Sequence, residues 1–226
     1  MADSLALPGL FGCGCVEDAA GERLRPGDGA IVKELFEHSR LRLGSLVLDV
    51  GCGTGESLSW LERHGFVGIG VDRDERALAI AASRVVSALF HGDGAHLPFA
   101  SAAVDAVLSE CSLSLMSDRR AALAEWARVM KLGGRLLLAD VDWPSHDGRD
   151  ELVDDIAAAG FTILHEEDRS DVLPAFVARF IFRYGSLDAL WGDRACTGQA
   201  AGRPRYRLLV AIRSAKAISS AGSASS

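Results

Sequence analysis

The amino-acid sequence predicts an α/β domain built on a doubly wound, mostly parallel sheet. Short apolar runs alternate with segments of helical periodicity, which is the pattern of strand–helix–strand units. The first apolar run leads into a turn with glycine at every second position, Gly51, Gly53 and Gly55. Asp49 and Asp72 follow the first two runs, and their separation along the chain fits one such unit.

Composition and charge limit the possible classes of function. The chain has 226 residues, 49% hydrophobic and 24% charged, as expected for one globular domain. Its net charge of −7 matches a polyanion poorly, so nucleic acid is disfavoured as a substrate. No apolar run approaches the roughly 18 residues needed to span a bilayer. The first residues carry an acid, Asp3, and no basic residue, and Pro8 breaks the first apolar run. We therefore expect no signal peptide, a cytoplasmic location and no membrane partner.

The cysteines favour reduced thiols over a disulfide framework. They are Cys13, Cys15, Cys52, Cys111 and Cys196. An odd number without a secretion signal fits a reducing compartment. One residue separates Cys13 from Cys15, where a zinc site usually has two, and no second pair follows. We therefore predict no metal site, and the oligomeric state stays open.

Residues 1–44 are expected to form an N-terminal cap segment and helix. Glycines punctuate an irregular start. An amphipathic helix follows, with Asp28 as the predicted N-cap and Ile31 and Leu35 on one face. The Pro-Gly turn before this helix carries Arg25.

Residues 45–213 are expected to form the main domain, including a helical insert at 168–204. Apolar runs predict strands at 46–48, 66–71, 88–91, 104–109, 135–141, 161–167 and 206–213. Helices are predicted at 57–62, 74–85, 118–131, 149–160 and 171–184, the second with Asp74 as its N-cap. The Ser/Ala-rich tail 214–226 can bury little apolar surface and is expected to be disordered.

The glycine turn reads D-x-G-x-G-x-G and resembles the first motif of class I S-adenosylmethionine (SAM)-dependent methyltransferases. A dinucleotide-binding G-x-G-x-x-G turn fails, because Glu56 and Leu58 stand where its last glycine would be. GDGAHLPF at 92–99 resembles the family's G-D-A-x-x-L-P-F segment. The resemblance covers about residues 24–213 and is closest to the small-molecule, methyltransferase type 11 group that includes ubiquinone and menaquinone methyltransferases.

This resemblance implies a Rossmann-like, seven-stranded sheet with an antiparallel last strand. It also implies SAM as cofactor and S-adenosylhomocysteine as product. Asp72 would accept both ribose hydroxyls, since a carboxylate has two acceptor oxygens, and Asp93 would accept the adenine amino group. The expected cofactor-binding residues are Asp49, Gly51, Cys52, Gly53, Asp72, Arg73, Asp93, Gly94, Ala95 and Glu110.

Glu110 and Arg25 are the candidates for the reacting end of the site. Glu110 closes the fourth predicted strand, where open α/β sheets bind ligands. We expect it to contact the methionine end of the cofactor, or to act as general base towards a substrate O–H or C–H. Arg25 can reach a carboxylate of cofactor or substrate, or remain a surface residue of the turn.

The sequence thus predicts a SAM-dependent methyltransferase acting on a small molecule, with the acceptor unidentified. A different possibility is arsenite methylation, in which Cys13, Cys15, Cys111 and Cys196 would supply thiolates. Another is a SAM-binding regulatory protein without turnover. Asp140 and Asp142 end the fifth predicted strand, but the pattern around them does not match magnesium-dependent catechol-type enzymes.

Overall fold

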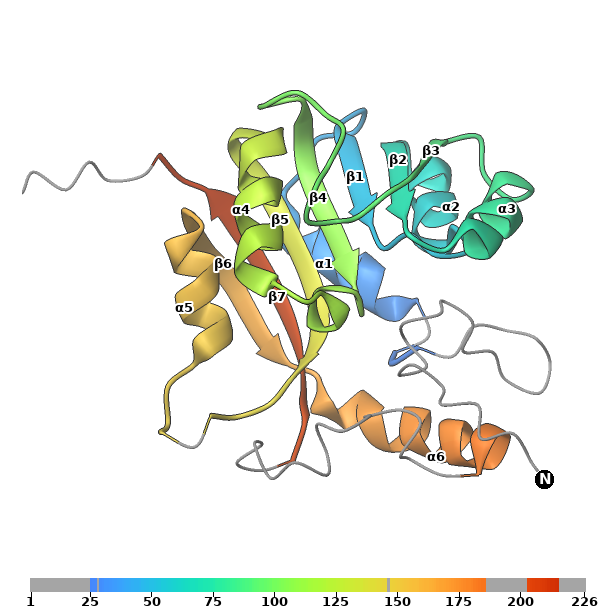
Figure 1. Ribbon diagram of the computed structural model, residues 1–226, viewed down its shortest axis with the longest axis vertical. Coiled ribbons are helices and arrows are strands. Elements are labelled where there is room, and N and C mark those ends of the chain that lie inside the picture. The colour runs from blue at the N-terminus through green and yellow to red at the C-terminus, as the bar shows by residue number, and fades with distance from the viewer. Residues whose placement is uncertain (1–24, 28, 146, 186–202, 216–226) are drawn as a thin grey trace, which may run out of the picture.

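The computed structural model describes residues 25–27, 29–145, 147–185 and 203–215. Its seven-stranded sheet has the order β3-β2-β1-β4-β5-β7-β6 (Figure 1). The strands are β1 (Leu46–Val50), β2 (Val67–Asp72), β3 (Ala88–His91), β4 (Val104–Glu110), β5 (Met130–Asp142), β6 (Phe161–Asp168) and β7 (Arg205–Arg213). Strands β1 to β5 pair in parallel, and β7 runs antiparallel to β5 and β6. The predicted fold class is confirmed, including the antiparallel last strand.

Helices cover both faces of this sheet. They are α1 (Ala30–Ser39), α2 (Glu56–Arg63), α3 (Glu75–Ala82), α4 (Arg119–Val129), α5 (Glu151–Ala158) and α6 (Leu173–Tyr184), with short 3-10 turns η2 (Leu113–Leu115) and η3 (Ser170–Val172). Val47 and Leu108 share one core with α1, α2 and α6, whereas Leu48 and Val107 share another with α4 and α5. Successive strand side chains point to opposite faces, so each central strand serves both cores.

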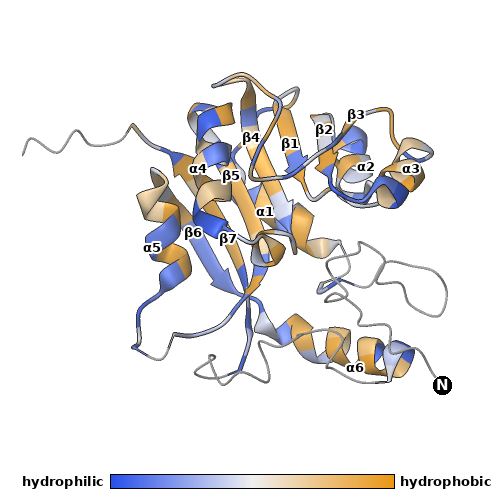
Figure 2. Cartoon of the chain, viewed as in Figure 1, coloured by the Kyte–Doolittle hydropathy of each residue, from blue (hydrophilic) through white to orange (hydrophobic). Residues whose placement is uncertain are grey.

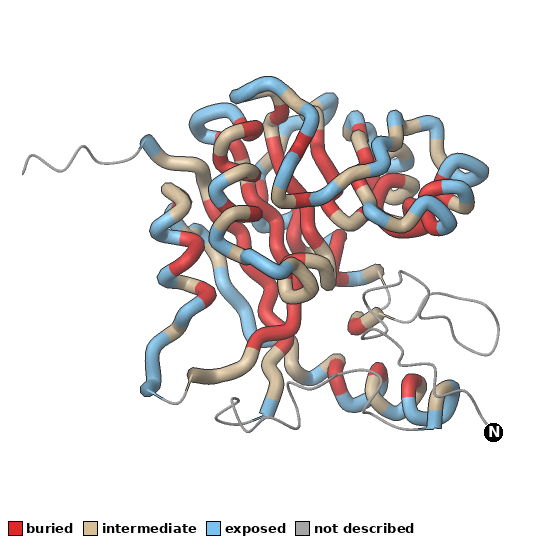
Figure 3. The backbone as a smooth tube through the Cα atoms, viewed as in Figure 1, coloured by how far each residue is buried: buried red, intermediate tan, exposed pale blue. Residues whose placement is uncertain are grey.

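The burial of the strands follows their place in the sheet. Apolar and buried residues concentrate in the central strands, whereas the edge strand β6 is mostly hydrophilic and exposed (Figures 2 and 3). Among the described residues, no helix is long and apolar enough to cross a membrane.

Three helices begin with an aspartate N-cap, and one of these, Asp74, was predicted from the sequence. Asp74, Asp118 and Asp150 accept backbone N–H bonds at the starts of α3, α4 and α5. The prediction for α1 is wrong, because its N-cap is Gly29, with a φ of 83° and no side-chain cap. The helix begins at Ala30 after this left-handed glycine, and Asp28 lies outside the described residues.

Strand β5 begins earlier than the sequence indicates. Val104 pairs with Met130 and Ala106 with Arg135, so residues 131–134 bulge out against β4. Gly133 lies in this bulge with a φ of 77°, a conformation that suits glycine. The segment between the helix predicted at 118–131 and the strand predicted at 135–141 is thus a bulge within a longer strand. Most of the tail 214–226 and the middle of the predicted insert, with Trp191 and Cys196, lie outside the described residues.

The carboxyl ends of β1, β2 and β4 meet at one edge of the sheet. In Figure 1 the arrowheads of β1 and β4 point towards the side of the molecule where α6 lies, whereas β7 points the opposite way. Asp72 and Glu110 are the last residues of β2 and β4 at this edge. Side chains at several strand ends are therefore brought together, as open α/β sheets require for ligand binding.

Candidate cofactor and active site

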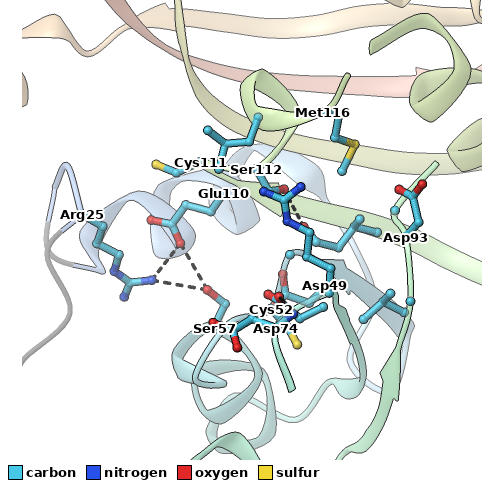
Figure 4. Close-up of a pocket in the computed structure, with 18 of the residues that line it drawn as sticks. Arg25, Asp49, Cys52, Ser57, Asp74, Asp93, Glu110, Cys111, Ser112 and Met116 are labelled. Atoms are coloured by element: carbon cyan, nitrogen blue, oxygen red, sulfur yellow. Dashed lines mark hydrogen bonds and ion pairs between the residues drawn. The ribbon is translucent and has the colours of Figure 1, made fainter. Parts of the chain in front are cut away.

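A cavity of about 390 Å³ lies at the ends of β1, β2 and β4 (Figure 4). Its lining includes these residues singled out from the sequence: Arg25, Asp49, Gly51, Cys52, Asp72, Arg73, Asp93, Gly94 and Glu110. Gly53 and Ala95 do not line it. Their N–H groups instead donate to Asp72 and Asp93, and so hold two carboxylates of the wall.

The glycine turn after β1 is fitted closely to the tip of β4. Gly51 has a φ of 81°, and a Cβ at this position would lie 2.4 Å from the Cβ of Ser112. Only glycine fits such a close approach. The Oγ of Ser112 donates to the carbonyl oxygen of Val50 at 2.7 Å and lies 2.7 Å from the Oγ of Ser109. The tip of β4 therefore sets the position of the turn.

Asp72 is held in place by two backbone N–H groups. Its Oδ2 accepts from Gly53 at 2.7 Å and its Oδ1 from Asp74 at 2.9 Å. Each carboxylate oxygen retains a second lone pair. The fixed carboxylate can therefore still accept two hydroxyl groups.

Asp93 lies on a different wall of the cavity, on the loop after β3. Its Oδ1 accepts the N–H of Ala95 at 2.9 Å, and its Oδ2 lies 3.2 Å from Nδ1 of His96. The Ala95 bond lowers the pKa of Asp93 more than burial raises it, and His96 adds to the lowering. A Cβ on Gly94 would lie 2.5 Å from Cε of Met116. Met116 thus fills the space where the family pattern has an alanine side chain.

Arg25 joins two acids at the opposite side of the cavity (Figure 4). Its Nη1 lies 2.8 Å from Oε2 of Glu110, and its Nη2 lies 3.2 Å from Oε2 of Glu56. Burial acts to lower the pKa of Arg25, but Glu110 and then Glu56 outweigh it, so the pKa is raised. The guanidinium is therefore held in its charged form by the two carboxylates.

Glu110 retains an unused acceptor. Its Oε2 takes the bond from Arg25 and another from Oγ of Ser57 at 3.2 Å. Its Oε1 is buried without a hydrogen-bond partner among the described residues, on a side chain that is 6% exposed. A buried carboxylate oxygen without a donor is costly, and native structures leave few of them. This atom is therefore suited to accept a donor from a bound molecule.

The residue after Glu110 has an unusual backbone conformation. Cys111 has a φ of 53°, which few residues other than glycine adopt. Its Sγ lies 3.5 Å from the hydroxyl oxygen of Tyr206, which is fully buried. Burial raises the pKa of Tyr206 well above its usual value, so the hydroxyl stays protonated. Such backbone conformations cluster at functional sites.

Protein donors already engage the acids at the end of β5. Asp140 accepts from the N–H and Oγ of Ser114, and burial raises its pKa. Asp142 accepts from Arg205 at 2.8 Å and Arg207 at 3.3 Å. Both carboxylates therefore take part in contacts within the protein.

His38, His165 and Glu167 form a separate cluster of metal-ligating types, with ligand atoms within 4.8 Å of one another. The two imidazole rings stack at 3.6 Å with 8° between their planes. The in-plane lone pairs of stacked rings run parallel, so in this arrangement they do not converge on one ion.

Several lining residues have weak or no sequence signals. Ser57 and Glu56 begin α2, where residues after a glycine turn are expected to face a ligand. Ser112 belongs to the strand tip that the sequence singled out only through Glu110. Met116 comes from an irregular segment after η2, and no local pattern identifies it.

Comparison with known proteins agrees with this geometry. Residues 48–138 match the family described as "Methyltransferase domain". Methyltransferase GfsG of Streptomyces halstedii is 35% identical over 130 residues, 54% of this chain and 44% of that protein. Demethylmenaquinone methyltransferase of Corynebacterium glutamicum is 40% identical over 104 residues, 46% of this chain and 45% of that protein. The chain thus spans about half the length of these curated relatives.

Solved structures share the fold over most of this chain. The [4+2]-cyclase SpnF has a TM-score of 0.65 and 28% identity, covering 82% of this chain and 81% of that one. Geranyl diphosphate C-methyltransferase from Streptomyces coelicolor A3(2) has a TM-score of 0.68 and 18% identity, covering 82% and 79%. At 18% identity the likeness shows the fold alone. The glycine motif, the sheet order and the match of residues 48–138 to the methyltransferase domain together support a class I methyltransferase, as the sequence resemblance implied.

Proposed function

We propose that the protein is a SAM-dependent methyltransferase acting on a small-molecule acceptor. The observation that carries the proposal is the buried Oε1 of Glu110, which has no donor among the described residues and belongs to a residue lining the cavity. Asp72 and Asp93 are fixed on other walls of the same cavity. The relatives named as methyltransferases support the same reaction class.

The donor and acceptor groups of the cavity fit the two ends of SAM. Asp93 and the backbone of Gly94 would hold the adenine ring, and Asp72 the ribose hydroxyls. At the amino-acid end, Glu110 suits an ammonium group and the charged Arg25 suits a carboxylate. This fit favours the cofactor contact for Arg25 over a substrate contact.

The protein's contribution to such a reaction is positional. SAM supplies an activated sulfonium methyl group when bound. The turn at Gly51, held by Ser112, and the two fixed acids would set the cofactor in one orientation and keep water out of the cavity. Glu110 would serve as general base only for an acceptor that must lose a proton, since its Oε1 accepts no bond from the described residues.

Calorimetric titration with S-adenosylhomocysteine tests the cofactor site directly. We expect binding of one molecule per chain, and no binding at millimolar concentration would contradict the proposal. Tritiated SAM with a panel of small organic acceptors that includes demethylated quinones then tests turnover. We expect tritium to be transferred to one class of acceptor, and only when the protein is present.

A second candidate is a reaction without methyl transfer on the same fold. The cyclase SpnF is 28% identical over 82% of this chain. If the chain binds S-adenosylhomocysteine but converts an acceptor to a product containing no tritium, this candidate replaces methyl transfer.

Arsenite methylation and a purely regulatory role have less support. Of the thiols that arsenite methylation requires, Cys13, Cys15 and Cys196 lie outside the described residues. The demethylmenaquinone methyltransferase among the relatives is named for an organic acceptor. A regulatory protein without turnover would bind the cofactor and label no acceptor. The acidic net charge supports a small-molecule partner over nucleic acid, and the odd number of cysteines supports a cytoplasmic location.

A further inference from the structure

We propose that Trp126, a core residue of α4, positions the loop that would receive the adenine ring. The inference rests on the proposed function, because it assigns a role towards the cofactor. The sequence pattern places Trp126 on the apolar stripe of its helix, where packing explains it fully. The contacts of its indole nitrogen indicate a second role.

Trp126 is fully buried, and its Nε1 donates to the carbonyl oxygen of Gly94 at 2.9 Å. A buried indole N–H needs an acceptor, and here the acceptor is in the candidate adenine loop. Because a peptide unit is planar, fixing the carbonyl of Gly94 also fixes the direction of the next N–H, that of Ala95. This N–H donates to Oδ1 of Asp93 at 2.9 Å. Trp126 therefore orients the peptide that holds the Asp93 carboxylate.

The same helix holds the loop at a second point, Leu97. Oε1 of Glu125 accepts the N–H of Leu97 at 2.8 Å, and Nη2 of Arg128 donates to the carbonyl oxygen of Leu97 at 3.2 Å. Glu125 and Arg128 also pair with each other through contacts of 2.7 and 2.8 Å. Both polar backbone groups of Leu97 are thus bonded to α4.

Packing around Gly94 places the loop against β1 and Met116, whereas the tilt of the Gly94–Ala95 peptide plane depends on its hydrogen bonds. A Cβ on Gly94 would lie 2.5 Å from Cε of Met116 and 2.6 Å from Cγ1 of Val50. The loop is therefore wedged beside β1 while α4 holds it at two backbone positions. Loss of the Trp126 bond would let the Gly94–Ala95 peptide turn and release the Asp93 carboxylate from its orientation.

The variant Trp126→Phe removes the N–H donor and keeps an aromatic ring in the core. We expect it to weaken S-adenosylhomocysteine and adenosine by the same factor, about five- to thirtyfold, as for loss of a buried hydrogen bond. Both affinities are measured by calorimetry. Equal factors are expected because the adenine end alone is disturbed. A general loosening of the pocket would weaken S-adenosylhomocysteine more than adenosine, because it would also cost contacts at the amino-acid end.

Trp60→Phe is the matched control. Trp60 lies on α2, stacks on His64 at 4.0 Å and does not line the 390 Å³ cavity. We expect this variant to bind both ligands as the wild type does. Should Trp126→Phe fail to fold, Glu125→Gln tests the second attachment point. It is expected to weaken both ligands equally, about two- to fivefold, through partial loss of the charged hydrogen bonds at Leu97 and Arg128.

The outcomes separate this inference from the proposed function. Wild-type affinity for both ligands in Trp126→Phe, or a larger loss for S-adenosylhomocysteine than for adenosine, would overturn the inference alone. If Trp126→Phe does not fold, Glu125→Gln decides. Wild-type affinity for both ligands in Glu125→Gln, or a larger loss for S-adenosylhomocysteine than for adenosine, would overturn the inference. A wild-type chain that binds neither ligand would overturn the proposed function and this inference together.

Discussion

Arg25 and Arg207 both lie among carboxylates near the carboxyl edge of the sheet, and their surroundings differ. Arg207, on β7, has a side chain that is 3% exposed and donates to Asp142, Asp150 and Glu166. Among the described residues, none of these three acids keeps a buried oxygen without a hydrogen bond. The three carboxylates around Arg207 are thus satisfied within the protein.

In the cluster around Arg25, by contrast, one buried carboxylate oxygen has no hydrogen-bond donor among the described residues. Arg25 pairs with Glu110 and Glu56 beside the cavity, and Oε1 of Glu110 is left without a donor among the described residues. A satisfied cluster stabilises the fold, whereas an unsatisfied buried acceptor beside a cavity offers a hydrogen bond to a ligand. The difference predicts that substitutions in the first cluster change stability and those in the second change ligand binding.

The largest expected effect is on stability, in Arg207→Met. Methionine has a side chain of similar length but carries no charge. The substitution therefore removes a buried cation and leaves the buried Asp142 carboxylate with less positive charge beside it. We expect the free energy of unfolding to fall by about 3–5 kcal/mol, as when one partner of a buried ion pair is removed. Urea unfolding measures it. The folded fraction should bind S-adenosylhomocysteine with wild-type affinity, and a loss of binding without a loss of stability would refute the contrast.

The next effect is on binding, in Glu110→Gln. The amide still accepts from Arg25 and Ser57, but it no longer offers a charged acceptor to an ammonium group. The affinity for S-adenosylhomocysteine should fall about 10- to 100-fold, as for loss of a charge-assisted hydrogen bond. The free energy of unfolding, measured in urea, should stay within about 1 kcal/mol of the wild-type value. Unchanged affinity would remove Glu110 from the cofactor site.

A smaller effect on binding is expected in Glu56→Gln. Glu56 is the second partner of Arg25, and its side chain is 32% exposed. Because exposed ion pairs contribute little, we expect the affinity for S-adenosylhomocysteine to change by about two- to fivefold. Calorimetric titration of Glu56→Gln and Glu110→Gln with S-adenosylhomocysteine compares the two losses of affinity. Equal losses in the two variants would mean that Arg25, not the oxygen of Glu110, dominates the site.

The smallest effect is the pH dependence of the Arg207 cluster. Burial acts to raise the pKa of Asp150, but Arg207, the N–H of Val153 and Arg205 together outweigh it, so the pKa lies below its usual value. A lowered folded-state pKa means that the carboxylate contributes stability above about pH 4 and loses that contribution as pH falls through the folded value. The stability difference between wild type and Asp150→Asn should therefore be constant from pH 7 to about 5 and shrink below about pH 4. A difference that grows towards acid would show that the assigned direction of the pKa shift is wrong.

The fold was predictable from the sequence because its signals are local. Continuous apolar runs define strands with two buried faces, and Asp74, Asp118 and Asp150 cap helices through N–H groups a few residues away. Misplaced boundaries arise where the conformation depends on neighbouring strands, as in the bulge at 131–134. The start of α1 was missed because a left-handed glycine, not a side chain, begins the helix.

The sequence by itself determined the fold class, the resemblance to class I methyltransferases and nine of the twenty residues that line the cavity, because these depend on periodicity and on motif spacing. Only the tertiary structure decided how those side chains pair. Arg25 and Glu110 lie 85 positions apart, and Gly94 and Trp126 lie 32 apart, so no local pattern records either contact. The physical reason is that hydrogen bonds and ion pairs form across the sheet edge, where residues distant in sequence meet, and their satisfaction depends on the packed structure.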